Sequence, residues 1–312
     1  MPCYHPIPAW KPQDLDAYGT KSGKPQLVFR PELGLASTKI EVPCGQCIGC
    51  RIERSRQWAV RCVHEASLHK KNCFLTLTYS ERNIPSGGTL KPDDIQKFLK
   101  RLRFKYKDQT IRFFQCGEYG EELQRPHHHI LLFGFDFPDK VPYGKNGKYT
   151  TYVSKICSEL WPYGLHQIGS LTFETAAYTA RYILKKITGD NATDHYADRK
   201  PEYVTMSRRP GIASDWFQQF AESDVYTYDK VVVRHNFTCR PPKYYDRLYD
   251  LQQPEKLSQL KAARSQRAKN NVNNTPDRLE VRKKIQEIKQ KNYATRNLET
   301  TPCSTGGKAR PA

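Results

Sequence analysis

Three consecutive histidines, His127 to His129, stand at the start of an apolar segment that ends at Phe135. On a β-strand, alternate side chains project from opposite faces, so His127 and His129 share one face and His128 points to the other. Two imidazoles on one face make half of a metal site, and pairing in a hairpin can bring Glu118 to them as a third ligand. Two His and one carboxylate suit Mg²⁺ or Mn²⁺ in a site that handles phosphate. The alternative is that these histidines line an exposed strand start and bind no metal.

A second group of candidate residues lies on a segment with helical periodicity, residues 174–187. Tyr178 and Tyr182 are four residues apart and therefore lie on the same helical face. A tyrosine hydroxyl beside a divalent ion can attack phosphorus and hold the product as a phosphotyrosine ester, while the ion polarises the phosphate. The alternative for a tyrosine pair at this spacing is packing in a core.

A third group consists of cysteines with the spacing C-x₂-C-x₂-C, namely Cys44, Cys47 and Cys50. A closed tetrahedral Zn²⁺ site needs a fourth ligand. Cys3 is our first choice, with His5 and Cys62 behind it. Three unligated thiols, or an iron–sulfur cluster, are the alternatives. A zinc ion here would be structural and would link an N-terminal arm to the rest of the chain.

The elements that must position these residues follow from hydrophobic periodicity, which predicts the order β-α-β-β-α-β with a further helix appended. The strands are expected at 73–79, 110–118, 127–135 and 165–173, and the helices at 91–106, 150–161 and 174–187. The two middle strands form a hairpin. This order is that of the split ferredoxin-like fold, an α+β fold in which two helices cover one face of a four-stranded antiparallel sheet.

The composition points to a polyanionic partner, because 51 Lys and Arg against 32 Asp and Glu give a formal charge of +19. The 19 Tyr and 13 Phe suit stacking on single-stranded nucleic acid, and suit a hydrophobic core equally well. No apolar run reaches the roughly 18 residues of a membrane span, and no signal peptide is present, so we expect a cytosolic protein with reduced cysteines.

The same composition divides the chain into three predicted segments. Residues 1–71 form a Cys-rich arm with a basic helix, residues 72–250 form the α+β domain, and residues 251–312 form a basic helical or disordered tail. The tail either adds nonspecific affinity for nucleic acid or keeps the protein soluble.

Three stretches taken together carry a resemblance: "CGEYGE…RPHHH", "AYTARYILKK" and "PCGQCIGCR". They resemble the HUH endonuclease superfamily of rolling-circle replication initiators and relaxases, and within it the initiators of small single-stranded DNA phages, the microviruses and in particular the gokushoviruses. The resemblance implies the HUH endonuclease fold. It also implies that His127, His129 and Glu118 bind the metal and that Tyr178 and Tyr182 are two nucleophiles.

The resemblance further implies a helper lysine at Lys185, and the chain departs from the family pattern at two positions. The middle residue of the histidine pair, usually bulky and hydrophobic, is His128, and the residue before the second tyrosine, often Lys, is Arg181. Arginine keeps the positive charge at that position.

The activity implied is metal-dependent nicking and rejoining of single-stranded DNA at an origin, in the host cytoplasm. One tyrosine would retain the 5′ phosphate, and the second would cut the regenerated origin so that the released 3′ hydroxyl closes a circle. The sequence contains no phosphate-binding P-loop, so a host helicase and polymerase are expected partners. Two alternatives stay open: a transposase or relaxase of a mobile element, and a non-catalytic nucleic-acid-binding protein with an RNA-recognition-like sheet.

Overall fold

The computed structural model describes residues 3–14, 26–120, 123–146, 149–181, 191–234 and 237–299. The chain divides into two compact units, one formed by Met1–Glu53 with Arg264–Ala312 and the other by Arg54–Ala263. Among the helices of the described residues, none has the length and apolar character needed to cross a membrane. The three-segment division at 71 and 250 stays a prediction.

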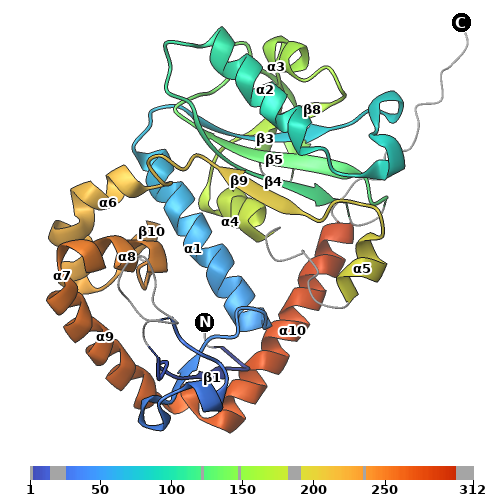
Figure 1. Cartoon of the computed structure of the whole chain (residues 1–312). Helices are drawn as coiled ribbons and strands as arrows, with labels where there is room; N and C mark the ends of the chain where they lie inside the picture. The colour runs from blue at the N-terminus through green and yellow to red at the C-terminus, as the bar shows by residue number, and fades with distance from the viewer. Residues whose placement is uncertain are drawn as a thin grey trace, which may run out of the picture. The chain divides into compact units, whose positions relative to one another are not determined.

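An antiparallel sheet of seven strands forms the centre of the unit Arg54–Ala263, with the order β6-β7-β8-β3-β5-β4-β9 (Figure 1). The strands are β3 (Asn72–Thr78), β4 (Arg112–Tyr119), β5 (Pro126–Phe133), β6 (Val141–Asn146), β7 (Tyr149–Val153), β8 (His166–Gly169) and β9 (Tyr203–Met206). The four strands predicted from the sequence lie together in the middle as β8-β3-β5-β4, each pair antiparallel. With its helices, this sheet confirms the mixed α+β class.

Helices cover both faces of the sheet, because both faces of its central strands are apolar (Figure 1). On one face pack α2 (Pro92–Lys105) and α3 (Lys155–Leu160), and on the other pack α1 (Ile48–Ser67), through its residues after Glu53, and α4 (Phe173–Arg181). The alternation of β5 shows the division: Ile130 and Leu132 join the core under α2, whereas Leu131 and Phe133 join the core under α1. Each central strand thus presents residues to two separate cores.

The expected helix at 150–161 is wrong over its first half. Residues Tyr149–Val153 form β7, which pairs with β6, and only Lys155–Leu160 are helical. Tyr, Thr and Val are enriched in strands because their side chains suit a pleated surface. Ser154 then starts α3 as its N-cap, since its hydroxyl accepts a hydrogen bond of 3.0 Å from the backbone N–H of Cys157.

Beyond residue 190 the second unit contains elements that the periodicity did not predict. They are α5 (Asn191–Tyr196), α6 (Ser214–Phe220), a π-helical turn (Ala221–Val225), α7 (Tyr226–Tyr228), β10 (Val231–Arg234), β11 (Phe237–Cys239), α8 (Lys243–Gln252) and the first part of α9 (Pro254–Lys269). Their buried aromatics, including Phe217, Tyr226 and Tyr245, pack in the core that also contains Ala59 of α1.

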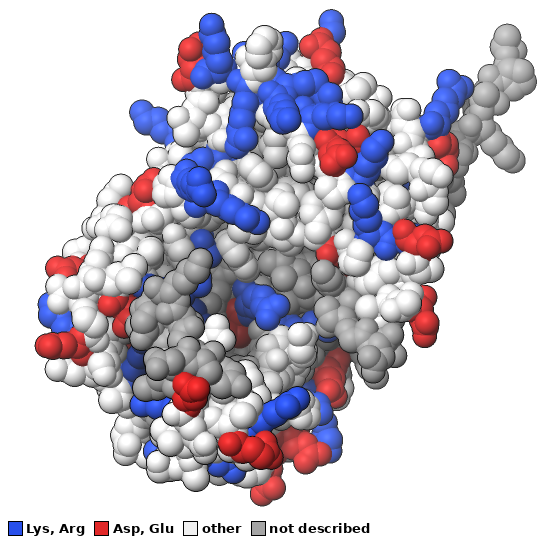
Figure 2. All heavy atoms as spheres, in the orientation of Figure 1, with Lys and Arg blue, Asp and Glu red and all other residues white. Residues whose placement is uncertain are grey.

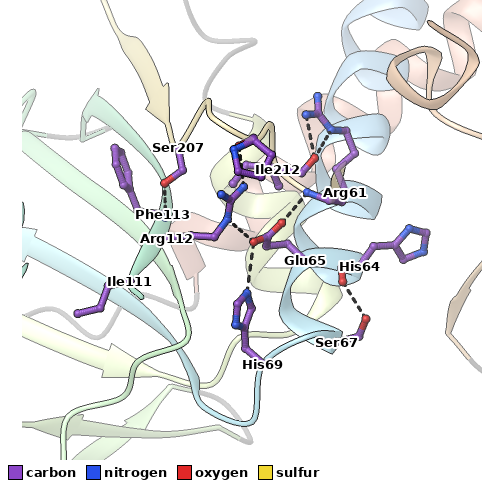
Figure 3. A network of polar contacts seen from close by, with 12 residues as sticks. Arg61, His64, Glu65, Ser67, His69, Ile111, Arg112, Phe113, Ser207 and Ile212 are labelled. Atoms are coloured by element: carbon purple, nitrogen blue, oxygen red, sulfur yellow. Dashed lines mark hydrogen bonds and ion pairs between the residues drawn. The ribbon is translucent and has the colours of Figure 1, made fainter. Parts of the chain in front are cut away.

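A buried ion pair joins α1 to the start of β4 (Figure 3). Glu65 is 2% exposed, and its Oε1 accepts a hydrogen bond of 2.5 Å from Nε of Arg112. Its Oε2 accepts a second bond of 2.6 Å from the backbone N–H of Ala213, and His69 lies 3.3 Å from Oε1. Because a buried carboxylate is stable only with such partners, this network fixes one end of β4, the strand that carries Glu118.

The unit formed by the two chain ends contains β1 (Ile7–Ala9) and β2 (Ile40–Val42), which pair antiparallel. Its helical segments include the one-turn segments Pro31–Leu33, Ala36–Thr38 and Val272–Asn274, the first residues of α1, the last residues of α9 and the long α10 (Pro276–Glu299). Trp10 lies against Gly34, where an added Cβ would stand 2.3 Å from the Trp10 Cβ, so a larger residue cannot fit there.

Candidate active site

The β4–β5 hairpin brings the predicted acidic residue to the histidines. Glu118 lies opposite His127 in the antiparallel register, and Cys116 lies opposite His129. The Nε2 atom of His129 is 2.7 Å from Oε1 of Glu118, and both side chains are at most 5% exposed. Glu118, His127 and His129 project from the same face of the sheet, and the Glu118 side chain contacts His129, the diagonal neighbour, across the two strands.

Two residues of β3, the strand that pairs with β5 on the side opposite to β4, contact the ring of His129. Thr76 pairs with His129 across the sheet, and its Oγ1 lies 3.0 Å from Nδ1 of the imidazole. Phe74 stacks on the same ring, with centroids 5.6 Å apart and an interplanar angle of 12°. A metal ligand needs the tautomer that carries its proton on Nδ1 and leaves Nε2 unprotonated, and the Thr76 hydroxyl oxygen is placed to accept that Nδ1–H.

The predicted nucleophile Tyr178 lies beside this pair. Its ring meets the ring of His129 edge to face, with centroids 5.2 Å apart and an angle of 81°. Helix α4 starts with a reciprocal cap, in which the hydroxyls of Thr172 and Thr175 each accept the other's backbone N–H, at 3.2 and 2.8 Å. Small residues then allow α4 to pack closely on the sheet: Ala176, Thr179 and Ala180, all buried.

Two of the predicted catalytic residues, Tyr182 and Lys185, lie outside the described residues. The described part of α4 ends at Arg181, whose guanidinium carbon is 5.9 Å from the centre of the Tyr178 ring.

The donors Glu118, His129 and His127 fit a divalent ion in their chemistry, two imidazole nitrogens and one carboxylate. Ligands at about 2.1 Å on one octahedral ion are about 3 Å apart, so the 2.7 Å between His129 and Glu118 is a few tenths of an ångström short. His127 is on the right face, but it does not complete a set with them. Among described His, Cys, Asp and Glu residues, only the four cysteines have three or more ligand atoms within 4.8 Å of one another.

The imidazole of His127 lies instead beside Gly120, where a methyl group would stand 3.7 Å from its Cε1 atom. A metal site with all three residues as ligands would therefore require the His127 ring to move closer to Glu118 and His129.

A family model and several known proteins resemble this chain. The family model of replication-associated protein ORF2/G2P matches residues 72–187, which contain the hairpin and all of α4. The replication-associated protein VP4 of Bdellovibrio phage phiMH2K is 33% identical over 228 residues, covering 70% of this chain and 71% of that protein. This chain belongs to the replication-associated proteins of small single-stranded DNA phages.

Two further members of that family show similar identity. The replication-associated protein ORF2 of Spiroplasma virus 4 is 36% identical over 221 residues, covering 66% of this chain and 67% of the relative. The replication-associated protein ORF4 of Chlamydia phage 1 is 32% identical over 215 residues, covering 65% and 52% of the two chains. No solved structure matches the chain.

His128 projects from the face of the sheet opposite to His127 and His129, as strand alternation predicts. It is fully buried, and burial, followed by the neighbouring His127 and His129, lowers its pKa to about 3. Its Nε2 lies 3.3 Å from the hydroxyl of Tyr79, which donates to Oδ2 of Asp94 at 3.0 Å. His128 is therefore a neutral core residue whose polar atoms are satisfied within the core.

The four predicted cysteines come together in the other unit. The ligand atoms of Cys3, Cys44, Cys47 and Cys50 all lie within 4.8 Å of one another. The alternative fourth ligands are not part of this group: His5 is exposed, and Cys62 is fully buried in the core between α1 and the sheet.

Exposed basic side chains gather on α2, and Figure 2 shows Lys and Arg over that helix. They are Lys91, Lys97, Lys100, Arg103 and Lys105. Phe104 stands among them with 87% of its surface exposed. Helix α2 packs on the face of the sheet that carries His128. The basic side chains of α2 therefore lie on the opposite side of the sheet from Glu118 and His129.

Thr76 and Phe74 are the site residues that sequence reasoning missed. The signal that could have identified them is the pairing of strands 73–79 and 127–135. Once these strands are antiparallel neighbours in the observed register, Thr76 must stand opposite His129. The sequence predicts both strands, but hydrophobic periodicity alone does not determine the register in which they pair.

Proposed function

We propose that this replication-associated protein initiates rolling-circle replication by nicking and rejoining single-stranded DNA through a phosphotyrosine intermediate. The observation that carries the proposal is the position of the Tyr178 ring, 5.2 Å from His129, whose Nε2 is 2.7 Å from Glu118. A phenol beside a pair of candidate metal ligands has the composition needed for covalent phosphoryl transfer. The relatives' names associate them with replication.

Glu118, His129 and a reoriented His127 would hold Mg²⁺ or Mn²⁺ in this proposal. Such an ion, when bound, polarises the scissile phosphate and stabilises charge on its oxygens. Thr76 and Phe74 keep the His129 ring in position by a hydrogen bond and by stacking.

The chemical step assigned to Tyr178 is an attack of its hydroxyl oxygen on phosphorus. The Oη–P bond forms, the bond from phosphorus to the 3′ oxygen breaks, the phenol gives up its proton and the departing 3′ oxygen takes one up. The phosphate stays on the tyrosine as a diester, so no nucleotide cofactor is needed for later rejoining. Arg181, on the turn that follows Tyr178, offers positive charge for a phosphate.

Tyr182 would be the second nucleophile and Lys185 the helper lysine, as the resemblance implies. With two tyrosines four residues apart in the sequence, the first would hold the 5′ end while the second cuts the regenerated origin. The 3′ hydroxyl released by the second cut then attacks the first diester and closes the circle.

The strand order β8-β3-β5-β4, in which the two candidate ligand strands β4 and β5 are antiparallel neighbours, supports an HUH endonuclease fold for the sheet. We also propose a single-stranded DNA origin as the substrate, a host helicase and polymerase as partners, and the host cytoplasm as the location. The net charge of +19 supports a nucleic-acid partner through its attraction for phosphates.

The experiment is incubation of the full chain with circular single-stranded DNA carrying the phage origin, with Mn²⁺, Mg²⁺ or EDTA. Nicked product and a denaturation-resistant protein–DNA adduct should form only with a divalent ion. Tyr178→Phe should lower adduct formation, while the control Tyr143→Phe, at a residue 68% exposed on β6, should leave it unchanged. Metal-independent nicking, or no adduct with any of these ions, would contradict the proposal.

A further inference from the structure

We propose that Cys3, Cys44, Cys47 and Cys50 form a structural zinc site that holds together the unit built from the two chain ends. This inference concerns a site apart from Glu118 and His129, and it does not depend on the nicking reaction. Three observations on this unit carry it: the separations of the sulfur atoms, the hydrogen bonds made to them, and the small size of the unit's apolar core.

The sulfur atoms are spaced as ligands of a single ion. A tetrahedron with Zn–S bonds of about 2.3 Å has edges of about 3.8 Å. The Sγ atoms of Cys3 and Cys44 are 3.6 Å apart, and those of Cys3 and Cys47 are 3.8 Å apart. A disulfide would require about 2 Å, and all four cysteines are free thiols.

The compactness of the group also argues against an iron–sulfur cluster. All four ligand atoms lie within 4.8 Å of one another. In a four-iron cluster each thiolate binds a different iron, so the sulfurs must stand farther apart than around one ion.

Backbone N–H groups point at the sulfurs, which is how a protein stabilises thiolates. The N–H of Tyr4 donates to Sγ of Cys47, that of Cys44 to Sγ of Cys3, and that of Cys47 to Sγ of Cys44, each at 3.3 Å. Gly45 adopts a φ of 76° inside this turn, a conformation that glycine adopts without steric cost. Four thiolates around Zn²⁺ carry two net negative charges, which these donors and the start of α1 offset.

The unit needs such a cross-link because it has little core of its own. Apart from prolines, its buried hydrophobic residues within 3–14, 26–53 and 264–289 are Ala9, Trp10 and Val28. Units with so small a core usually depend on a metal or on disulfides for stability. The ion would join the N-terminal segment at Cys3 to the segment that enters α1.

The test is metal analysis of the full chain purified without added metal, with Cys47→Ser and the double variant Cys44→Ser/Cys47→Ser. Cys239→Ser is the matched control, because Cys239 is partly buried and lies outside the group. About one zinc per chain is expected in the wild type and the control, with a loss of at least tenfold in both variants. Limited proteolysis should then cut the N-terminal segment in the variants and in chelator-treated wild type while the sheet stays resistant.

Other results would overturn the proposal. They are wild-type protein without metal, iron with its visible absorption in place of zinc, disulfides among the four cysteines, or zinc unchanged in the double variant. The wild-type measurement needs no variant to fold. Zinc in a chain that nicks no DNA supports this inference and contradicts only the proposed function, so the two fail separately.

Discussion

Replacing Thr76 with Val tests whether a hydroxyl on β3 sets the orientation of His129. Valine has nearly the shape of threonine and suits a strand, so the substitution removes one interaction, the 3.0 Å contact between Oγ1 and Nδ1 of His129. The stacking of Phe74 on the imidazole stays. The hydrogen bond between Oγ1 and Nδ1 is lost at a residue that is 4% exposed, where water replaces a lost hydrogen bond poorly.

The expected size of the effect follows from the role of such a partner. Removing a hydrogen bond that orients a metal-binding histidine typically lowers metal affinity about 10- to 100-fold, which is about 1.4 to 2.7 kcal/mol. We therefore expect Thr76→Val to weaken Mn²⁺ binding by that factor in calorimetry. Nicking should need correspondingly more Mn²⁺ and recover at saturating concentration.

Two controls separate positioning from a general loss of stability. Thr76→Ser keeps the hydroxyl and should restore most of the affinity. Thr150→Val makes the same substitution on β7 and should change neither binding nor nicking. If Thr76→Val binds Mn²⁺ like the wild type and nicks with the same metal dependence, the hydroxyl does not position His129 and the reasoning fails.

Three further predictions concern the cores around the site. Burial lowers the pKa of His64 to about 4. Because the unfolded chain takes up a proton near pH 6.5 and the folded state resists it, stability should fall as the pH drops from about 6.5 to about 4, by about 3 kcal/mol. Acid unfolding followed by tryptophan fluorescence should be less steep in His64→Phe, and equal steepness would contradict this. Arg112→Met leaves Glu65 buried without its guanidinium and should lower the free energy of unfolding by about 3–5 kcal/mol; a loss below 1 kcal/mol in urea unfolding would refute the role of the ion pair. His128→Leu should retain nicking activity, whereas His129→Ala should lose it. Loss of nicking in His128→Leu with activity kept in His129→Ala would show that His129 is not on the catalytic face of the sheet.

The part of the site that could be predicted from sequence rests on local periodicity. The pleat alone separates His128 from His127 and His129, and the hairpin alone brings Glu118 near them. Both are properties of a few consecutive residues. The burial of His128, and the 2.7 Å contact of His129 with Glu118, agree with those expectations.

What could not be predicted depends on partners far apart in the chain. Thr76 becomes a partner of His129 only through the register of β3 with β5. Strand β9 has only four residues, Tyr203–Met206, and forms by pairing with β4. Residues Tyr149–Val153 form a strand by pairing with β6, although the sequence predicts a helix over 150–161, and the helix begins only after the N-cap Ser154. In each case tertiary pairing, which leaves little trace in a short segment, decided the structure.

Identification of the residue that carries DNA after a nicking reaction is the decisive test of the proposed phosphotyrosine intermediate. The full chain is incubated with origin single-stranded DNA and Mn²⁺, digested with nuclease and protease, and the peptide bearing the residual nucleotide is sequenced by mass spectrometry. We expect a phosphodiester on Tyr178 in the wild type and, in Tyr178→Phe, on Tyr182. A nucleotide on a residue outside 174–187, or its absence from every peptide despite nicked DNA, would contradict the phosphotyrosine mechanism.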